Sequence, residues 1–234
     1  MRKFFTQNKI YFEIFSLLVL GVGGTIITYF QYKVSNQALL IQQSQALPLL
    51  RLNVEKLQNF NNSFFDTEVL NVYNEGELIK DINCTTTSFI RLRINKSASN
   101  YKSSIIYLPL AEYLNTKTIT SQHKGKLMEL YSFGNYKSFY NNIYIKAIQN
   151  SNNNLTISAE RITLVNLTYR DIINTHHTEY YYVTSESQLI DRTKYLKVMQ
   201  ASMEYFNKKY SISEVDFSRL LRIAKTAHDS VDVI

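Results

Sequence analysis

The histidine pair His176 and His177 is the group in the sequence that most suggests chemistry, because Asp171 and Glu179 lie within a few residues of it. Imidazole and carboxylate groups are ligands of zinc, so a metal site is the first hypothesis. Neighbouring residues of a strand point to opposite faces, however, which keeps the two imidazoles from sharing one ion. We therefore expect this pair to occupy a loop between two strands and to have no ligand role.

Catalytic motifs do not accompany the histidine pair. The sequence has four histidines, and it lacks a glycine-rich phosphate loop, a nucleophile elbow and zinc-ligand spacing. Its carboxylates are dispersed, so no acid and base can be paired. We expect a protein that is not an enzyme and that has no catalytic, cofactor-binding or metal-binding residues. An envelope hydrolase without a recognisable motif is one alternative.

An uncharged segment of nineteen residues, Ile14 to Tyr32, lies near the N-terminus. At about 1.5 Å per residue, a helix of this length nearly covers the roughly 30 Å hydrocarbon core of a bilayer. A helix also satisfies its own backbone groups, which lipid requires. We expect residues 1–33 to form a cytoplasmic flank and a single transmembrane helix.

Basic residues flank this segment unequally. Arg2, Lys3 and Lys9 precede it, and only Lys33 follows it before Arg51. The more basic flank usually stays in the cytoplasm, so the predicted N-terminus is cytoplasmic and the C-terminal domain lies outside the cell membrane. Small residues do not close the run as a cleavage site would, which favours an uncleaved signal anchor over a signal peptide.

Two glycine and threonine pairs repeat within the segment at a spacing of four, Gly21 with Thr25 and Gly24 with Thr28. Small residues at this spacing allow two membrane helices to approach closely. The pattern is a candidate helix-pairing surface for a homodimer. The alternative is that glycine is simply common in membrane helices.

Residues 34–48 favour a helical juxtamembrane stalk. The run from Val34 to Leu47 has no charge, no glycine and no proline, and Pro48 then disfavours a helical conformation at the residue before it. The stalk and the transmembrane helix are therefore expected to form one continuous helix.

Residues 49–184 alternate apolar and polar side chains in short runs that polar clusters separate. This pattern predicts strands with one buried and one solvated face. Seven to nine such strands are typical of a single immunoglobulin-like antiparallel β-sandwich, so the expected fold class is mainly β. The expected strands cover residues 50–54, 70–73, 90–94, 104–108, 126–133, 143–147, 165–170 and 179–183.

Residues 185–234 change to a helical period and predict a helical hairpin. The run 185–188 resembles a capping box, and a turn at 211–213 separates the two helices. The first helix also carries basic residues, so it could bind an anionic membrane surface or a partner groove; packing on the sandwich is favoured. The apolar stripe expected for the first helix consists of Leu189, Leu196, Met199, Met203, Phe206 and Tyr210. The stripe expected for the second helix consists of Phe217, Leu220, Leu221, Ala224 and Ala227. The basic residues of the first helix are Arg192, Lys194, Lys197, Lys208 and Lys209.

The charge balance gives little support to nucleic-acid binding. The formal net charge is +7, and residues 1–33, with four basic residues and one acidic residue, account for +3 of it. The remaining positive charges are scattered along the chain instead of forming a run. Cys84 is the single cysteine, so an intramolecular disulfide and a lipoprotein anchor are both excluded.

The run 42–48, Gln-Gln-Ser-Gln-Ala-Leu-Pro, followed by a strand and then by Val-Tyr-Asn-Glu-Gly at 72–76, resembles a loose group of uncharacterised bacterial single-pass membrane proteins. The resemblance covers about residues 10–80. It implies a glutamine-rich juxtamembrane helix before a β-sandwich, and it implies no activity.

These observations favour a membrane-anchored, non-catalytic binding or scaffolding module that contacts another protein or a glycan. A cytoplasm-facing membrane regulator or defence component is the alternative from a different class, in which the basic helices would meet acidic lipid.

Overall fold

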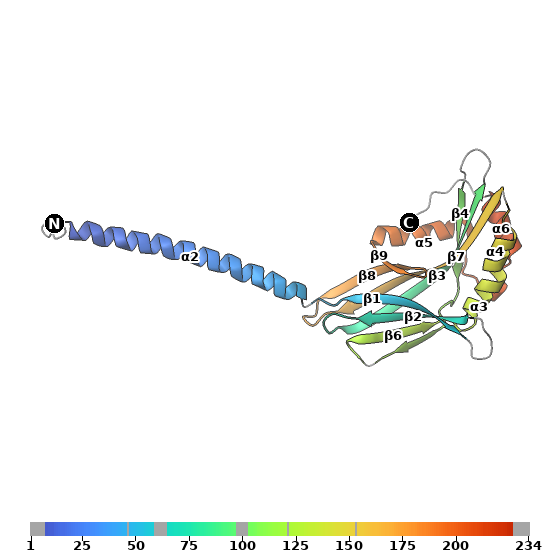
Figure 1. The fold of residues 1–234 in the computed structure, drawn as a ribbon, viewed down its shortest axis with the longest axis horizontal. Helices are drawn as coiled ribbons and strands as arrows, with labels where there is room; N and C mark the ends of the chain where they lie inside the picture. The colour runs from blue at the N-terminus through green and yellow to red at the C-terminus, as the bar shows by residue number, and fades with distance from the viewer. Residues whose placement is uncertain are drawn as a thin grey trace. The chain divides into compact units, whose positions relative to one another are not determined.

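A computed structural model describes residues 8–45, 47–58, 65–96, 103–120, 122–152 and 154–226. The chain divides into two compact units, Met1–Leu47 and Pro48–Ile234. The first unit contains one long helix, and the second contains two β-sheets and shorter helices (Figure 1).

Helix α2 (Lys9–Gln45) contains both the expected span and the described part of the expected stalk. Among the described residues it is the one helix long and apolar enough to cross a membrane, over Lys9–Leu39 with a mean hydropathy of 2.0. Its apolar side chains are exposed on every side. Such a helix favours a non-aqueous surrounding.

The second unit contains two antiparallel sheets. The four-stranded sheet has the order β1-β2-β6-β5, and the five-stranded sheet has the order β4-β3-β7-β8-β9. The strands are β1 (Leu50–Gln58), β2 (Phe65–Asn74), β3 (Lys80–Lys96), β4 (Ser103–Leu110), β5 (Thr116–Ile119), β6 (Gly125–Tyr131), β7 (Leu155–Arg170), β8 (His176–Val183) and β9 (Ser187–Ile190).

This strand order confirms the immunoglobulin-like prediction. If the first eight strands are lettered A, B, C, C′, D, E, F and G, the four-stranded sheet is A-B-E-D and the other sheet contains C′-C-F-G. That is the immunoglobulin arrangement. Strand β9 adds a further edge strand, so the five-stranded sheet continues past residue 184.

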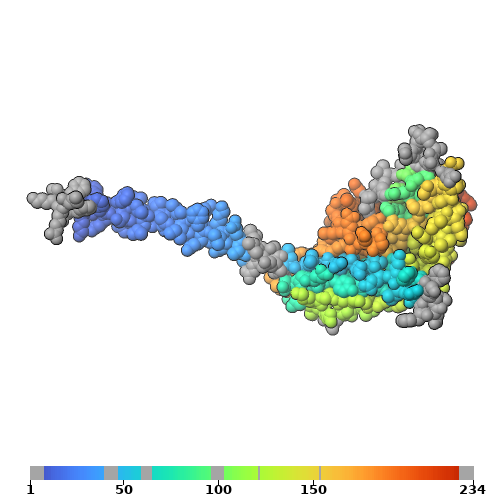
Figure 2. Space-filling view, viewed as in Figure 1, coloured from blue at the N-terminus to red at the C-terminus, as the bar shows by residue number. Residues whose placement is uncertain are grey.

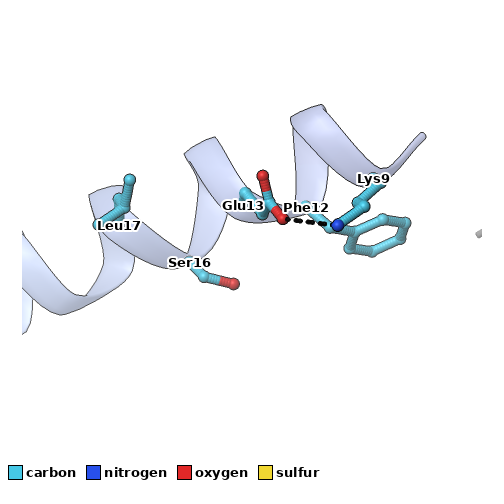
Figure 3. Close-up of a pocket in the computed structure, with 5 residues that line it drawn as sticks. All are labelled: Lys9, Phe12, Glu13, Ser16 and Leu17. Carbon is cyan, nitrogen blue, oxygen red and sulfur yellow. Dashed lines mark ion pairs between the residues drawn. The ribbon is translucent and has the colours of Figure 1, made fainter. Parts of the chain in front are cut away.

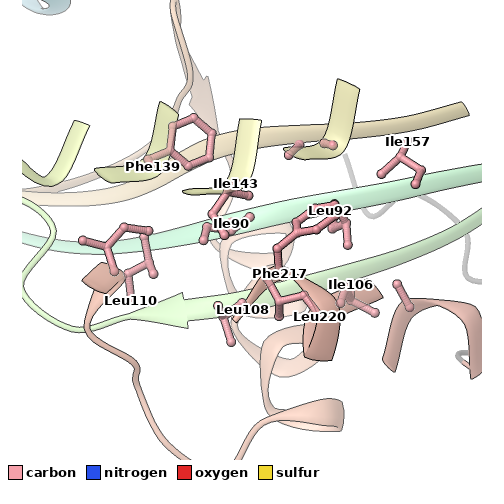
Figure 4. Close-up of a cluster of buried hydrophobic side chains, with 14 of the residues drawn as sticks. Ile90, Leu92, Ile106, Leu108, Leu110, Phe139, Ile143, Ile157, Phe217 and Leu220 are labelled. Carbon is pink, nitrogen blue, oxygen red and sulfur yellow. The ribbon is translucent and has the colours of Figure 1, made fainter. Parts of the chain in front are cut away.

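The long strands β3 and β7 extend beyond the four-stranded sheet. Side chains on one of their faces belong to two separate hydrophobic cores. Toward the end where Lys80 of β3 lies opposite Arg170 of β7, Cys84 and Val165 pack against side chains of the four-stranded sheet, including Val72. Further along the same face, Leu92 and Ala159 belong to a second core that helices cover. Figure 4 shows side chains of this second core converging from the strands and the helices.

The opposite face of the five-stranded sheet is also covered. Helix α5 (Arg192–Tyr205) places Val198 against Phe89, Ile162 and Tyr107 in a third core. The expectation of one wet face is therefore wrong for β3, β4 and β7. The alternation of the sequence does not reveal this cover, because it comes from residues far along the chain.

The strand expected at 143–147 is wrong. Residues 135–149 form one helical segment, α3 (Asn135–Phe139), η1 (Tyr140–Tyr144) and α4 (Ile145–Gln149). Phe139, Ile143 and Ala147 are buried at a spacing of four, so this short apolar run fits both periods. Gly134 begins the segment with a φ of +74°, a conformation that favours glycine.

The start expected for the first C-terminal helix is also wrong, since 187–190 form β9. Helix α5 begins instead after Asp191, whose carboxylate accepts a hydrogen bond from the backbone N–H of Lys194 at 2.8 Å. The expected stripe is rotated as well, because Leu196 and Met203 are exposed while Val198 and Ser202 are buried.

The second C-terminal helix, α6 (Phe217–Thr226), buries Phe217, Leu220 and Ala224 as expected. Ala227 lies outside the described residues. The two helices belong to cores on opposite faces of the five-stranded sheet, so they do not lie side by side as a hairpin would. Between them Tyr210 bonds the edge of β4, donating to Pro109 O at 2.9 Å and accepting from Ala111 N at 2.8 Å.

A matched pair of substitutions tests the register of α5. Val198→Ala removes fully buried methyl groups and should lower the free energy of unfolding by about 2 kcal/mol. Met203→Ala removes an exposed side chain and should change it by less than about 0.5 kcal/mol. Denaturant unfolding of the full chain in detergent, followed by circular dichroism, measures both. Equal effects would contradict the register.

Candidate functional site

A polar and aromatic cavity of the second unit lies where the four-stranded sheet ends and the helical segment 135–149 begins. It has a volume of about 280 Å³ and is lined by residues from β1, β2, β7 and the helical segment. We call it the tyrosine cleft. Its defining residues are Lys56, Glu68, Tyr136, Tyr140, Tyr144 and Arg161.

A buried ion pair lines the cleft. Arg161 Nη2 lies 2.6 Å from Glu68 Oε1, and the two side chains are only 7% and 5% exposed. Glu68 comes from β2 and Arg161 from β7, so the pair joins the two sheets. Tyr113 donates its hydroxyl proton to the other oxygen of Glu68 at 3.2 Å. Burial, with the Glu68 carboxylate beside it, raises the pKa of Tyr113.

The remaining donors of Arg161 are largely satisfied. Nη1 donates to Thr163 Oγ1 and to the carbonyl of Val183, both at 3.1 Å, and Nη2 donates to the carbonyl of Thr184 at 2.7 Å. Thr163 in turn hydrogen-bonds Ser88 at 2.7 Å. Nε is buried without a hydrogen bond among the described residues. This network separates the two apolar cores on that face of β3 and β7.

Three tyrosines form a stack beside the ion pair. The Tyr136 and Tyr140 ring centroids lie 6.4 Å apart with an interplanar angle of 28°, and those of Tyr140 and Tyr144 lie 5.3 Å apart at 20°. The closer pair spans the π-helical turn η1. The closer and more nearly parallel pair of rings is therefore the one within the π-helical turn.

Lys56 covers the free end of the stack, with Nζ 5.2 Å from the Tyr136 ring centroid. Among the described residues, no carboxylate lies within 4 Å of Lys56. The other charges of the cleft are paired, Arg161 with Glu68 and Glu160 with Arg91. Among the four charged residues that line the described part of the cleft, Lys56 is therefore the one without an ion-pair partner.

The described lining of the cleft combines aromatic rings, hydroxyl groups and charged side chains. Its tyrosines have no hydroxyl hydrogen bond among the described residues, and Ser185 and Thr184 lie at its border. A flat apolar surface next to hydroxyl groups and one cation suits a ligand with both apolar and polar faces. Histidine and cysteine do not occur among the described residues that line the cleft.

The histidine pair has a structural role in place of the loop position expected for it. His176 and His177 begin β8. His177 Nε2 lies 2.9 Å from Asp171 Oδ2, and the imidazole stacks on Tyr169 at 5.1 Å. This hydrogen bond lowers the pKa of Asp171. The described residues hold no group of three metal ligands.

The expected helix-pairing residues lie on one face of α2. The hydroxyls of Thr25 and Thr28 donate to the carbonyls of Gly21 and Gly24, each at 2.8 Å. No atom outside the helix lies within 4 Å of a Cβ built on either glycine. This surface is open, and pairing through it stays a prediction.

A surface depression lies along the first turns of α2, beside Lys9, Phe12 and Leu17 (Figure 3). Lys9 and Glu13 form an exposed ion pair of 3.7 Å there. One side of a single helix cannot enclose a ligand, so this depression is not a binding site.

Sequence reasoning missed the tyrosine cleft. Its one visible signal is the spacing of four between Tyr136, Tyr140 and Tyr144, which the strand expected at 143–147 obscured. The partnership of Glu68 and Arg161 joins residues 93 positions apart and has no local pattern.

Comparisons of the chain with protein-family models, curated proteins and solved structures find no match. The resemblance to bacterial single-pass proteins stays a prediction.

Substitution of Glu68 tests the importance of the buried pair. Glu68→Gln leaves the Arg161 charge buried without a counterion and should lower the free energy of unfolding by about 3–5 kcal/mol. Glu75→Gln breaks the exposed pair of Arg51 and Glu75 at 3.3 Å and should change it by less than about 1 kcal/mol. Urea unfolding of the full chain compares them. A small effect of Glu68→Gln would show that the pair contributes little.

Proposed function

We propose that the chain is a membrane-anchored, non-catalytic binding module. Helix α2 serves as the anchor, with the N-terminus in the cytoplasm and the sandwich outside. The exposed apolar surface of α2 supports its role as the anchor. The excess of basic residues before it supports the cytoplasmic placement of the N-terminus. The sandwich supplies a rigid body on which a ligand site can be held.

The tyrosine cleft is the proposed ligand site. The observation that carries this proposal is the tyrosine stack, which lies beside a buried ion pair and includes a π-helical turn. Single π-helical turns occur often at functional sites. The cleft lies near Lys56, toward the end of β1 remote from Leu50, where the chain joins the sandwich.

An acidic saccharide is the ligand class that the cleft fits best. A sugar ring presents C–H groups that pack on aromatic side chains, and its hydroxyls can hydrogen-bond phenol groups. Lys56 adds one positive charge that a carboxylate can meet. The volume of about 280 Å³ is near the lower end for small-molecule pockets and suits one sugar unit.

Calorimetric titration of the full chain in detergent with two probes tests this function. A disaccharide that ends in glucuronic acid should bind more tightly than its neutral methyl ester. Tyr140→Leu should weaken the binding of both probes about tenfold, because it removes the middle ring of the stack. Lys56→Met should weaken only the acid, by about fivefold, because it removes one charge and keeps the aliphatic stem.

Lys124→Met is the matched control, since Lys124 is an exposed residue in the turn before β6. It should leave both affinities unchanged. Failure of the wild-type chain to bind either probe would contradict the proposed ligand class, and equal loss of the acid in both lysine variants would contradict the role of Lys56.

A further inference from the structure

The helices that cover the second core lie over neighbouring strands. Turn η1 and helix α4 contact β7, while α6 contacts β3 and β4, which come next in the strand order. Helix α3 also contacts the 3₁₀ turn η2 (Ile212–Glu214), which closely precedes α6. Figure 1 shows α3, α4 and α6 along the same edge of the second unit. We call the segment 135–149 together with α6 the helical layer.

The charged side chains of the helical layer are all basic. Residues 135–149 and 217–226 include five basic residues and no aspartate or glutamate. All five are exposed, and among the described residues no carboxylate lies within 4 Å of any of them. They are Lys137, Lys146, Arg219, Arg222 and Lys225. Solvated helix surfaces usually mix charges of both signs, so a surface of one sign indicates an anionic partner.

Three of these cations form a stripe on α6. Arg219, Arg222 and Lys225 recur every three residues, which places them along one side of the helix. They extend over about 9 Å, since a helix rises about 1.5 Å per residue. The opposite side of α6 faces the second core through Leu220 and Ala224. Helices that bind a membrane surface bury their apolar face in the lipid, and that face of α6 is already covered. A soluble polyanion therefore fits the stripe better than a bilayer does.

Acidic residues near α6 lie before the helix. Asp216 directly precedes it, and its carboxylate accepts a hydrogen bond from the backbone N–H of Ser218 at 3.0 Å. A carboxylate at this end of a helix is stabilised by the free N–H groups there. Glu214 lies earlier, in η2. These two charges leave the basic stripe itself uninterrupted.

The helical layer borders the tyrosine cleft. The three stacked tyrosines line the cleft from the same segment that carries Lys137 and Lys146. Nine residues separate these two lysines, which is about 13 Å along a helix. Asn141 is exposed between them and adds an amide donor and acceptor. In Figure 2 this segment, coloured yellow, forms part of the visible surface. A chain-like ligand that leaves the cleft over the segment meets these groups first.

An aromatic ring with cations beside it recurs at the far side of the layer. Lys208 Nζ lies 5.2 Å from the Tyr210 ring centroid, and Arg219 Cζ lies 5.9 Å from it. Lys56 and Tyr136 form the same arrangement in the cleft, also at 5.2 Å. Tyr210 bonds the edge of β4, whereas residues that follow β8 line the cleft. In the strand order the helical layer therefore lies between the two clusters.

We infer that the helical layer extends the tyrosine cleft into a binding track for an acidic polysaccharide of several units. The inference rests on the proposed function, because the cleft holds the first sugar unit. An acidic polysaccharide carries sugar rings and negative charges at regular intervals. Its rings match the tyrosines at both ends of the track, and its charges match the unpaired cations between them. Contacts along one chain reinforce each other through effective concentration.

Calorimetric titration of the full chain in detergent with two lengths of one saccharide tests the inference. The probes are a disaccharide that ends in glucuronic acid and an octasaccharide of the same repeat. The wild-type chain should bind the octasaccharide at least about thirtyfold more tightly, well above the roughly fourfold statistical gain of four equal repeats. Raising the salt concentration from about 0.05 M to about 0.5 M should remove most of this gain, because the cations are exposed.

A matched pair of double variants separates the track from net charge. Lys137→Met with Arg222→Met should weaken octasaccharide binding about tenfold and leave the disaccharide unaffected, because neither residue lines the cleft. Lys194→Met with Arg192→Met removes the same two kinds of charge from exposed positions of α5, on the opposite face of the five-stranded sheet. This control should change neither affinity.

The disaccharide measures the proposed function, and the gain with length measures the inference. Octasaccharide binding within about fourfold of disaccharide binding would overturn the inference and leave the proposed function standing. Equal losses in the two double variants would overturn it too. So would a single-stranded oligothymidylate of the same charge that binds as tightly as the octasaccharide, because the layer would then be a nucleic-acid surface. Failure of both saccharides to bind would contradict the proposed function and the inference together.

Discussion

Strands β3 and β7 pair in one continuous register from Asn83 opposite Thr168 to Lys96 opposite Leu155. This pairing joins the two halves of the five-stranded sheet, with β4 on one side and β8 on the other. Each of the three hydrophobic cores draws side chains from β7. Because the pair is longer than any strand of the four-stranded sheet, it extends past that sheet and needs a second cover, which the helices provide.

The candidate site follows from that mismatch in length. At the place where the four-stranded sheet ends and the helical segment begins, the inward face of β7 changes from apolar to polar. Arg161 and Thr163 occupy this boundary, and Glu68 of β2 neutralises the arginine. The tyrosine stack lies over the same boundary, because the helical segment 135–149 reaches from the four-stranded sheet to the helices that cover the second core. The cleft is thus a junction between two cores, which is a common place for a ligand site.

The alternating strands predicted much of the architecture. Ile90, Leu92 and Ile94 show the two-residue period of a half-buried strand, and Pro48 marks the end of the first unit. The helical segment 135–149 was missed because Phe139, Ile143 and Ala147 fit two periods and nothing local decides between them. Helix α5 was placed in the wrong register because its buried side is set by Phe89 and Tyr107, which lie about a hundred residues earlier in the sequence.

The candidate site was less predictable than the fold for the same reason. A histidine pair is conspicuous in a sequence, yet the contacts of His177 in the structure are a hydrogen bond to Asp171 and a ring contact with Tyr169. The contact between Glu68 and Arg161 depends on strand order, and strand order is not encoded in any short motif. Predicting it requires knowing that β2 and β7 face each other across the sandwich.

Native-state hydrogen exchange of the full chain in detergent tests most directly whether the β3 and β7 pair organises the fold. The account predicts that the amides of Leu92 and Ile162, in the centre of this pair, exchange only through global unfolding, while those of β1 and β5 exchange through smaller openings. If the amides of β3 and β7 exchange before those of the four-stranded sheet, the account is contradicted.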